Sequence, residues 1–105
     1  MDTLSRLEQT IAGRLTTGEA ADSYVAHLKA RGLPVIARKV GEEAIETVTA
    51  ALAGTNAELT GEAADLLFHL LVLLAAKNVP LADVLAELDR REGTSGHDEK
   101  ASRST

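Results

Sequence analysis

Two groups of carboxylate residues stand at helical spacing in this chain, and they are the residues best suited to chemistry. The first group is Glu42-Glu43-x-x-Glu46, and the second is Glu62-x-x-Asp65. Each residue of a helix advances by about 100°, so residues three or four apart share one face. Carboxylates gathered on one face repel one another. Divalent cations such as Mg²⁺ take oxygen ligands, so we expect a cation to be the reason for the arrangement.

Each of these residues also has a simpler interpretation. A charged position on a helix usually faces solvent, and for the first acidic group alone that interpretation is the better one. Lys39 fits an ion pair with Glu43, one turn later, as well as it fits a phosphate contact. Arg38 fits a solvated side chain slightly better than a substrate contact. His69, one turn after Asp65, fits a hydrogen-bonded buried histidine better than a direct metal ligand.

The helices that carry the two acidic groups can be recognised from their apolar residues. Opposite the first group runs an apolar stripe that is typical of a core-facing helix. The stripe consists of Ile36, Val40, Ala44, Ile45, Val48, Ala51 and Leu52. The second group lies beside the run 66–76, whose apolar residues point in nearly every direction, and this pattern predicts a buried helix. An ionised carboxylate is costly to bury unless it is paired or bound to metal, so the second group favours the cation site.

The pattern predicts five helices, at about residues 3–15, 22–30, 34–53, 55–77 and 80–91. Asp22 or Ser23 can cap the second of them, and Thr55 with Glu58 can form a capping box for the fourth.

The composition indicates one small all-α domain. Of the 105 residues, 45% are hydrophobic and only 2% aromatic, so Ala, Leu, Val and Ile must build a core of helices packed on helices. After Arg91 the chain contains no Val, Leu or Ile. We therefore expect a domain over residues 1–91 and a flexible tail over residues 92–105.

Charge and hydropathy exclude several classes of partner. The net charge of -5 argues against a sequence-independent grip on nucleic acid. No cysteine is present, so there is no disulfide and no thiolate metal site. The start of the chain lacks the pattern of a signal peptide, and the run 66–76 is about half of the roughly 20 residues that span a membrane. We expect a cytoplasmic protein with no membrane partner.

The absence of several sequence motifs excludes further classes of enzyme. A di-iron bundle needs Glu-x-x-His on two helices, and neither Glu46 nor Glu62 has a histidine three residues later. There is no Walker-type phosphate loop and no serine or cysteine nucleophile motif. Metal-assisted hydrolysis of a phosphoanhydride remains, in which a carboxylate orients or deprotonates the attacking water.

The order E-E-x-x-E then E-x-x-D resembles the all-α, MazG-type nucleotide pyrophosphohydrolase superfamily. Within it, residues 39–46, 64–71 and the tail segments 93–96 and 99–103 resemble the phosphoribosyl-ATP pyrophosphohydrolase family, and the resemblance covers almost the entire chain. It implies a bundle of four to five helices that assembles as a homodimer. It also implies Mg²⁺-dependent hydrolysis of phosphoribosyl-ATP to phosphoribosyl-AMP and pyrophosphate, the second step of histidine biosynthesis.

The same resemblance implies roles for individual residues. The implied metal ligands are Glu43, Glu46, Glu62 and Asp65. Glu42 would hold a second ion or position the water. The candidate catalytic residues are then Glu42 together with Glu43 and Glu46. Lys39 would meet the polyphosphate. The other candidate substrate contacts are Arg38, Lys100 and Arg103, of which the last two are solvated tail residues by default and would reach a neighbouring subunit's site in a dimer.

Two alternatives stay open at this point. A house-cleaning pyrophosphohydrolase for another nucleoside triphosphate would share the metal site and differ in its contacts to base and sugar. A non-catalytic helical dimerisation module would use the acidic residues to bind a basic partner or a structural ion.

Overall fold

The computed structural model describes residues 2–17 and 23–93. These residues form five α-helices and no strand, which confirms the all-α prediction. The helices are α1 (Thr3–Thr17), α2 (Tyr24–Arg31), α3 (Leu33–Ala53), α4 (Asn56–Ala76) and α5 (Leu81–Arg91). The expected tail lies outside the described residues after Gly93, and so do Lys100 and Arg103.

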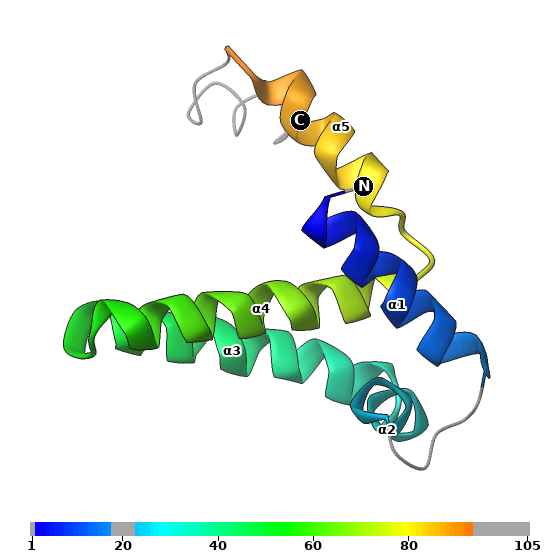
Figure 1. Cartoon of the computed structure of the whole chain (residues 1–105), viewed down its shortest axis with the longest axis horizontal. Coiled ribbons are helices and arrows are strands. Elements are labelled where there is room, and N and C mark those ends of the chain that lie inside the picture. The colour runs from blue at the N-terminus through cyan, green and yellow to red at the C-terminus, as the bar shows by residue number, and fades with distance from the viewer. Residues whose placement is uncertain (1, 18–22, 94–105) are drawn as a thin grey trace.

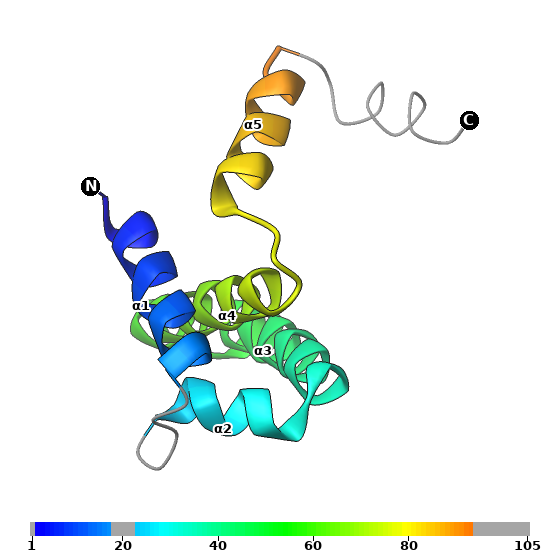
Figure 2. The same cartoon turned by 90° about the vertical axis from the view of Figure 1, so that its right-hand side faces the viewer.

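The helices α3 and α4 form an antiparallel pair that dominates the structure (Figure 1). Helix α1 crosses the C-terminal half of α4, and α2 packs against both α1 and the first part of α3 (Figures 1 and 2). Helix α5 points away from the other four in both views. The two acidic groups of the sequence therefore lie on neighbouring helices.

Local side-chain chemistry sets the helix ends, close to the expected positions. The hydroxyl of Ser23 caps α2 by accepting a hydrogen bond from the backbone N–H of Ala26 at 3.3 Å. Gly32 follows α2 with a φ of 98°, a value that glycine tolerates best. The capping box before α4 is confirmed. Glu58 N–H donates to the Thr55 hydroxyl at 3.1 Å, and Thr55 N–H donates to the Glu58 carboxylate at 3.0 Å.

Replacing Thr55 with alanine is expected to destabilise the protein by about 1 kcal/mol, because the backbone N–H of Glu58 loses its acceptor. For a domain of this size, that loss lowers the melting temperature by about 4–8 °C. Circular dichroism melts would measure it. Thr60→Ala is the control, since the Thr60 hydroxyl only donates back to the Asn56 carbonyl within the same helix. Equal melting temperatures for the two variants would refute the role of the cap.

The core lies where α1, α2, the start of α3, the end of α4 and the first residue of α5 meet. Its buried residues are Ile11, Leu15, Val25, Leu28, Ile36, Leu71, Val72 and Leu81. Partly buried leucines of α1 and the C-terminal half of α4 surround it. The packing is therefore concentrated at one end of the α3–α4 pair.

The other end of the pair departs from the sequence-based expectation. The apolar stripe of α3 was expected to face the core, and this is wrong for its second half. Ile45, Val48 and Leu52 are 67%, 54% and 84% exposed, and we call these three residues the outer stripe. The reason is that α4 packs along another side of α3, and none of the other described helices covers this end (Figure 1).

Helix α4 is also incompletely covered in the single chain. It was expected to be buried, in part against a second subunit, and among its described residues only His69, Leu71 and Val72 are buried, while Leu67 is 47% exposed. Among the described helices, α4 is also the one that is long and apolar enough to cross a membrane, judged by length and composition alone. Glu62 and Asp65 lie within it, and α3 runs beside it, so we interpret its apolar surface as a helix-packing surface.

Candidate active site

Three carboxylates from two helices meet between α3 and α4. One oxygen each of Glu43, Glu62 and Asp65 lie within 4.8 Å of one another. Oxygens that share one cation at about 2.0–2.6 Å are separated by no more than about 5 Å, so this spacing suits a single ion. Glu43 is buried, Glu62 is half-buried and Asp65 is exposed, so the cluster opens to solvent on the Asp65 side.

Two oxygens in this cluster lack protein partners. Glu43 Oε2 and Glu62 Oε2 are buried, and neither accepts a hydrogen bond. A buried carboxylate oxygen without a donor is costly, and a cation removes that cost. Because the cluster contains only oxygen atoms, it fits a hard cation such as Mg²⁺ better than a thiolate-seeking metal.

Thr47 ties the two helices together beside the cluster. Its hydroxyl lies 2.7 Å from the backbone carbonyl oxygen of Glu43 and 3.2 Å from that of Glu62, and it can donate to either. Sequence reasoning missed Thr47. The only available signal was a polar residue one turn after Glu43, which a solvated threonine would match equally well.

The remaining residues of the first acidic group lie outside this cluster. Glu46 is exposed, and it lines a cavity of about 300 Å³ together with Glu58 and Glu62. Glu42 is also exposed, and its carboxylate lies 3.8 Å from Arg38 Nε and 3.7 Å from Lys39 Nζ. The first acidic group therefore points in more than one direction. Glu43 joins the cluster, Glu46 lies at the cavity beside it that Glu58 and Glu62 also line, and Glu42 lies beside Arg38 and Lys39.

Lys39 joins the site through two carboxylates. Besides Glu42, its Nζ lies 3.6 Å from Glu43 Oε1. Desolvation lowers the pKa of Lys39, but the neighbouring Tyr24 phenol and the two glutamates outweigh it, so the pKa lies above its ordinary value. Lys39 is therefore a cation held at the edge of the carboxylate cluster.

Burial raises the pKa of Glu43, and the neighbouring Glu46 carboxylate raises it further, while His69 and Lys39 oppose the shift. A carboxyl group whose pKa is raised on folding stabilises the fold at low pH, and this contribution is lost as the pH rises through the folded-state pKa. Ionised Glu43 therefore destabilises the metal-free protein near neutral pH.

Replacing Glu43 with glutamine is expected to raise the melting temperature in metal-free buffer at pH 7.5 by a few degrees, because the wild-type carboxyl group is costly to ionise in the folded state. The difference should shrink as the pH falls and Glu43 becomes protonated in the wild type. Thermal melts in chelator over a pH series would test this. A Glu43→Gln variant that is less stable than the wild type at neutral pH, and by at least as much in acid, would contradict the prediction.

His69 and Tyr24 form a hydrogen-bonded chain next to the cluster. His69 is buried, and its Nδ1 lies 2.7 Å from the Asp65 backbone oxygen while its Nε2 lies 2.7 Å from the Tyr24 hydroxyl. The Tyr24 ring also stacks against Phe68, at 6.0 Å between centroids and 27° between planes. Both nitrogens of His69 have partners, as expected of a hydrogen-bonded buried histidine.

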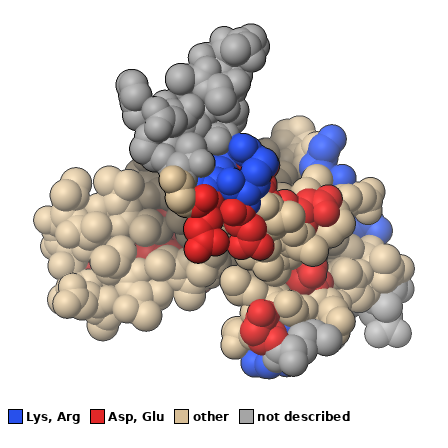
Figure 3. All heavy atoms as spheres, turned by 90° about the horizontal axis from the view of Figure 1, so that it is seen from above, with Lys and Arg blue, Asp and Glu red and all other residues tan. Residues whose placement is uncertain are grey.

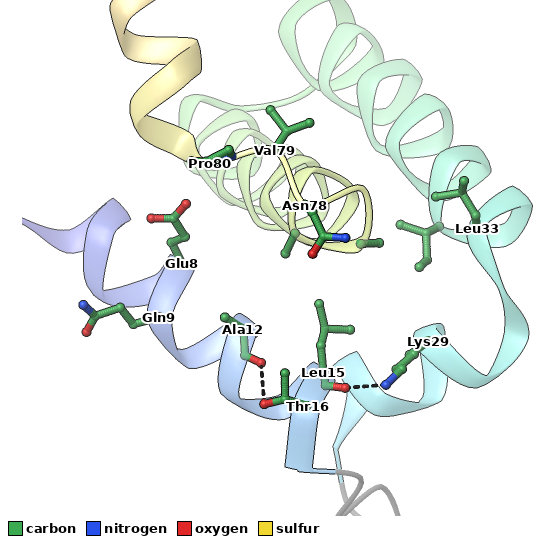
Figure 4. A pocket seen from close by; sticks show the side chains of 13 residues that line it. Glu8, Gln9, Ala12, Leu15, Thr16, Lys29, Leu33, Asn78, Val79 and Pro80 are labelled. Atoms are coloured by element: carbon green, nitrogen blue, oxygen red, sulfur yellow. Dashed lines mark hydrogen bonds between the residues drawn. The ribbon is translucent and has the colours of Figure 1, made fainter.

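A larger cavity, of about 770 Å³, lies apart from the carboxylate cluster (Figure 4). Residues of α1, α2, the start of α3 and the α4–α5 connection line it, and none of the three clustered carboxylates does. Its charged groups serve the fold. Glu8 accepts a hydrogen bond from the Leu81 N–H at 2.7 Å, and Lys29 donates to the Leu15 carbonyl at 2.5 Å.

The described helices carry a cluster of carboxylates between two antiparallel helices with a lysine at its edge, which defines an all-α protein with a group of oxygens that could hold a cation. The chain belongs to the phosphoribosyl-ATP pyrophosphohydrolase family, whose model matches residues 4–92.

Individual relatives agree with this assignment over nearly their full length. A phosphoribosyl-ATP pyrophosphatase of Novosphingobium aromaticivorans is 68% identical over 96% of this chain and 94% of its own. The protein of the same name from Erythrobacter litoralis is 65% identical over 98% of each chain. That from Rhizorhabdus wittichii is 65% identical over 96% of this chain and 94% of its own.

Proposed function

We propose that this protein hydrolyses phosphoribosyl-ATP to phosphoribosyl-AMP and pyrophosphate, as the names of its relatives indicate for them. This is a step of histidine biosynthesis. The observation that carries the proposal is the convergence of Glu43, Glu62 and Asp65 in a member of this family. The cluster supplies the cation site that phosphoanhydride hydrolysis requires.

The ion we propose is Mg²⁺, held by Glu43, Glu62 and Asp65. Two of these residues present buried oxygens without partners, which supports the assignment. We propose Glu46 as a fourth ligand, because its carboxylate influences the pKa of Glu43 and lines a cavity with Glu62. When bound, the ion neutralises charge on the phosphate groups.

The protein's own side chains would orient the reactants. Lys39, held at the edge of the cluster, is proposed to contact the polyphosphate, and Arg38 would add a second positive charge on the same turn. Glu42 is exposed beside both and is proposed to orient the attacking water. The water oxygen bonds to phosphorus and gives up a proton to solvent, while the phosphoanhydride bond breaks and pyrophosphate leaves. Lys100 and Arg103 remain proposed substrate contacts through the resemblance alone.

A homodimer is proposed for the assembly. The outer stripe of α3 leaves large apolar side chains uncovered at the end of the helix pair. On the face drawn in Figure 3, the described residues over this end, on the left of that view, show no Lys or Arg. A two-fold partner would bury the stripe against its own copy. We propose that the dimer acts in the cytoplasm on a small nucleotide substrate. We propose neither nucleic acid nor a membrane as a partner.

Pyrophosphate release by the purified protein tests the proposed function. Phosphoribosyl-ATP and, separately, a panel of nucleoside triphosphates would be offered with Mg²⁺ and again after chelation. We expect hydrolysis of phosphoribosyl-ATP that chelation stops without loss of helical circular dichroism. Preference for another triphosphate would favour the house-cleaning alternative, and no turnover at all would favour a non-catalytic helical module.

A further inference from the structure

Thr47 stands between the two helices that carry the carboxylate cluster. Its hydroxyl oxygen lies 2.7 Å from the backbone carbonyl oxygen of Glu43 on α3 and 3.2 Å from that of Glu62 on α4. These are the two residues whose buried carboxylate oxygens lack a hydrogen-bond partner. One hydroxyl therefore contacts the main chain of two of the three clustered carboxylate residues, one on each helix.

The contact with α4 separates Thr47 from other helical threonines. A threonine within a helix can donate to the carbonyl four residues earlier, as Thr10 and Thr60 do at 3.1 and 2.9 Å. The contact of Thr47 with Glu43 follows the same local rule. Its contact with Glu62 spans 15 positions of the chain, and only the packing of α4 against α3 brings it about.

Neither carbonyl depends on this hydroxyl for a hydrogen bond. Glu43 and Glu62 both lie inside helices, where each carbonyl accepts from the backbone N–H four residues later. A carbonyl oxygen has a second lone pair, which the hydroxyl can use. Loss of the hydroxyl would leave neither carbonyl unpaired, so its cost to folding is small. Its main effect falls on the spacing of α3 and α4 beside the cluster.

The spacing of α3 and α4 decides how the carboxylates meet. One oxygen each of Glu43, Glu62 and Asp65 lie within 4.8 Å of one another. Carboxylates this close repel one another when no cation lies between them, and the repulsion acts to separate the two helices. A hydroxyl that bonds to both helices at this level opposes the separation. The ligands are then already assembled when the cation binds, which favours tight binding.

We propose that Thr47 is a positioning residue for the cation site, whose hydroxyl, donating to the main chain of Glu43 and Glu62, holds α3 and α4 at the spacing that the cation requires. The proposal rests on the cation site of the proposed function. It adds to that site a residue that supplies no ligand and acts through the two glutamates.

Replacing Thr47 with valine tests this role, because valine keeps the branched shape and removes the hydroxyl. Binding of Mn²⁺ without substrate would be followed by electron paramagnetic resonance. The dissociation constant should rise about tenfold, the lower end of the effect of residues that orient metal ligands. Thr47→Ser keeps the hydroxyl and should restore most of the affinity. Thr60→Val is the matched control, since the Thr60 hydroxyl donates within its own helix, and it should bind Mn²⁺ as the wild type does.

Two further measurements distinguish positioning from a loss of stability. In chelator, Thr47→Val should melt close to the wild type, while the rise in melting temperature on adding Mg²⁺ should be smaller in the variant, because weaker binding stabilises less. With phosphoribosyl-ATP, the Mg²⁺ concentration that gives half the maximal rate should rise about tenfold, in line with the weaker cation binding. The rate at saturating Mg²⁺ should stay near that of the wild type.

The possible results separate this proposal from the proposed function. Equal Mn²⁺ affinity in Thr47→Val and the wild type would overturn the positioning role and leave the hydrolase activity standing. So would a loss of affinity that Thr47→Ser fails to restore or that Thr60→Val shares, or a Thr47→Val variant that is unfolded in chelator. A wild type that binds Mn²⁺ but releases no pyrophosphate would refute the proposed function alone. A wild type that binds no Mn²⁺ would refute both.

Discussion

Replacing Asp65 with asparagine is expected to lower the rate of pyrophosphate release at least about a hundredfold, because Asp65 is a proposed ligand of the cation, and a bound cation supplies several kcal/mol of charge stabilisation. Asparagine has nearly the same shape and lacks the charge. Asp65 is exposed, so the substitution creates no cavity and should leave the helical circular dichroism unchanged. The measurement is kcat/KM for phosphoribosyl-ATP at saturating Mg²⁺.

Two further variants serve as a control and as a test of the proposed fourth ligand. Asp89→Asn removes an exposed carboxylate from α5, away from the cluster, and should keep wild-type activity. Glu46→Gln tests the proposed fourth ligand, and a loss comparable to that of Asp65→Asn would support it. Near wild-type turnover of Asp65→Asn would show that Asp65 does not hold the catalytic ion.

The features that the sequence predicts well depend on neighbours along the chain. The capping box of Thr55 and Glu58 joins residues three apart, and the start of α2 depends on Ser23 and the turn that follows it. Such interactions form whatever the rest of the fold does, so their sequence signal is strong. The five helices follow from the same local rules.

The features that the sequence could not predict depend on which helix faces meet. The spacing of Glu43 and Glu46 places them on one side of α3, but only the packing against α4 decides that Glu43 is the buried member. Thr47 and Tyr24 gain their partners from α4, at residues 15 and 45 positions away in the chain. No periodicity within one helix carries that information.

The outer stripe of α3 shows how the periodicity itself can mislead. Apolar spacing indicates a surface that will be buried, and it does not say by what. In α3 the first turns bury Ile36 in the core of the same chain, while Ile45, Val48 and Leu52 continue the pattern without cover. The unmet prediction of a core-facing helix therefore becomes an argument for a second copy of the chain.

Replacing Leu52 with glutamate is accordingly expected to convert a dimer into a monomer. Leu52 is 84% exposed in the single chain, so in a monomer the change would be almost neutral. In a dimer it would bury a charge, and two-fold symmetry would place two such charges in one interface, at a cost of several kcal/mol each. Light scattering should give twice the 11.0 kDa chain mass for the wild type and a single chain mass for the variant. Leu88→Glu, at a 55% exposed position on α5, is the control and should remain a dimer. A wild type that is monomeric at micromolar concentration, or a Leu52→Glu variant that stays dimeric, would show that the outer stripe is not the interface.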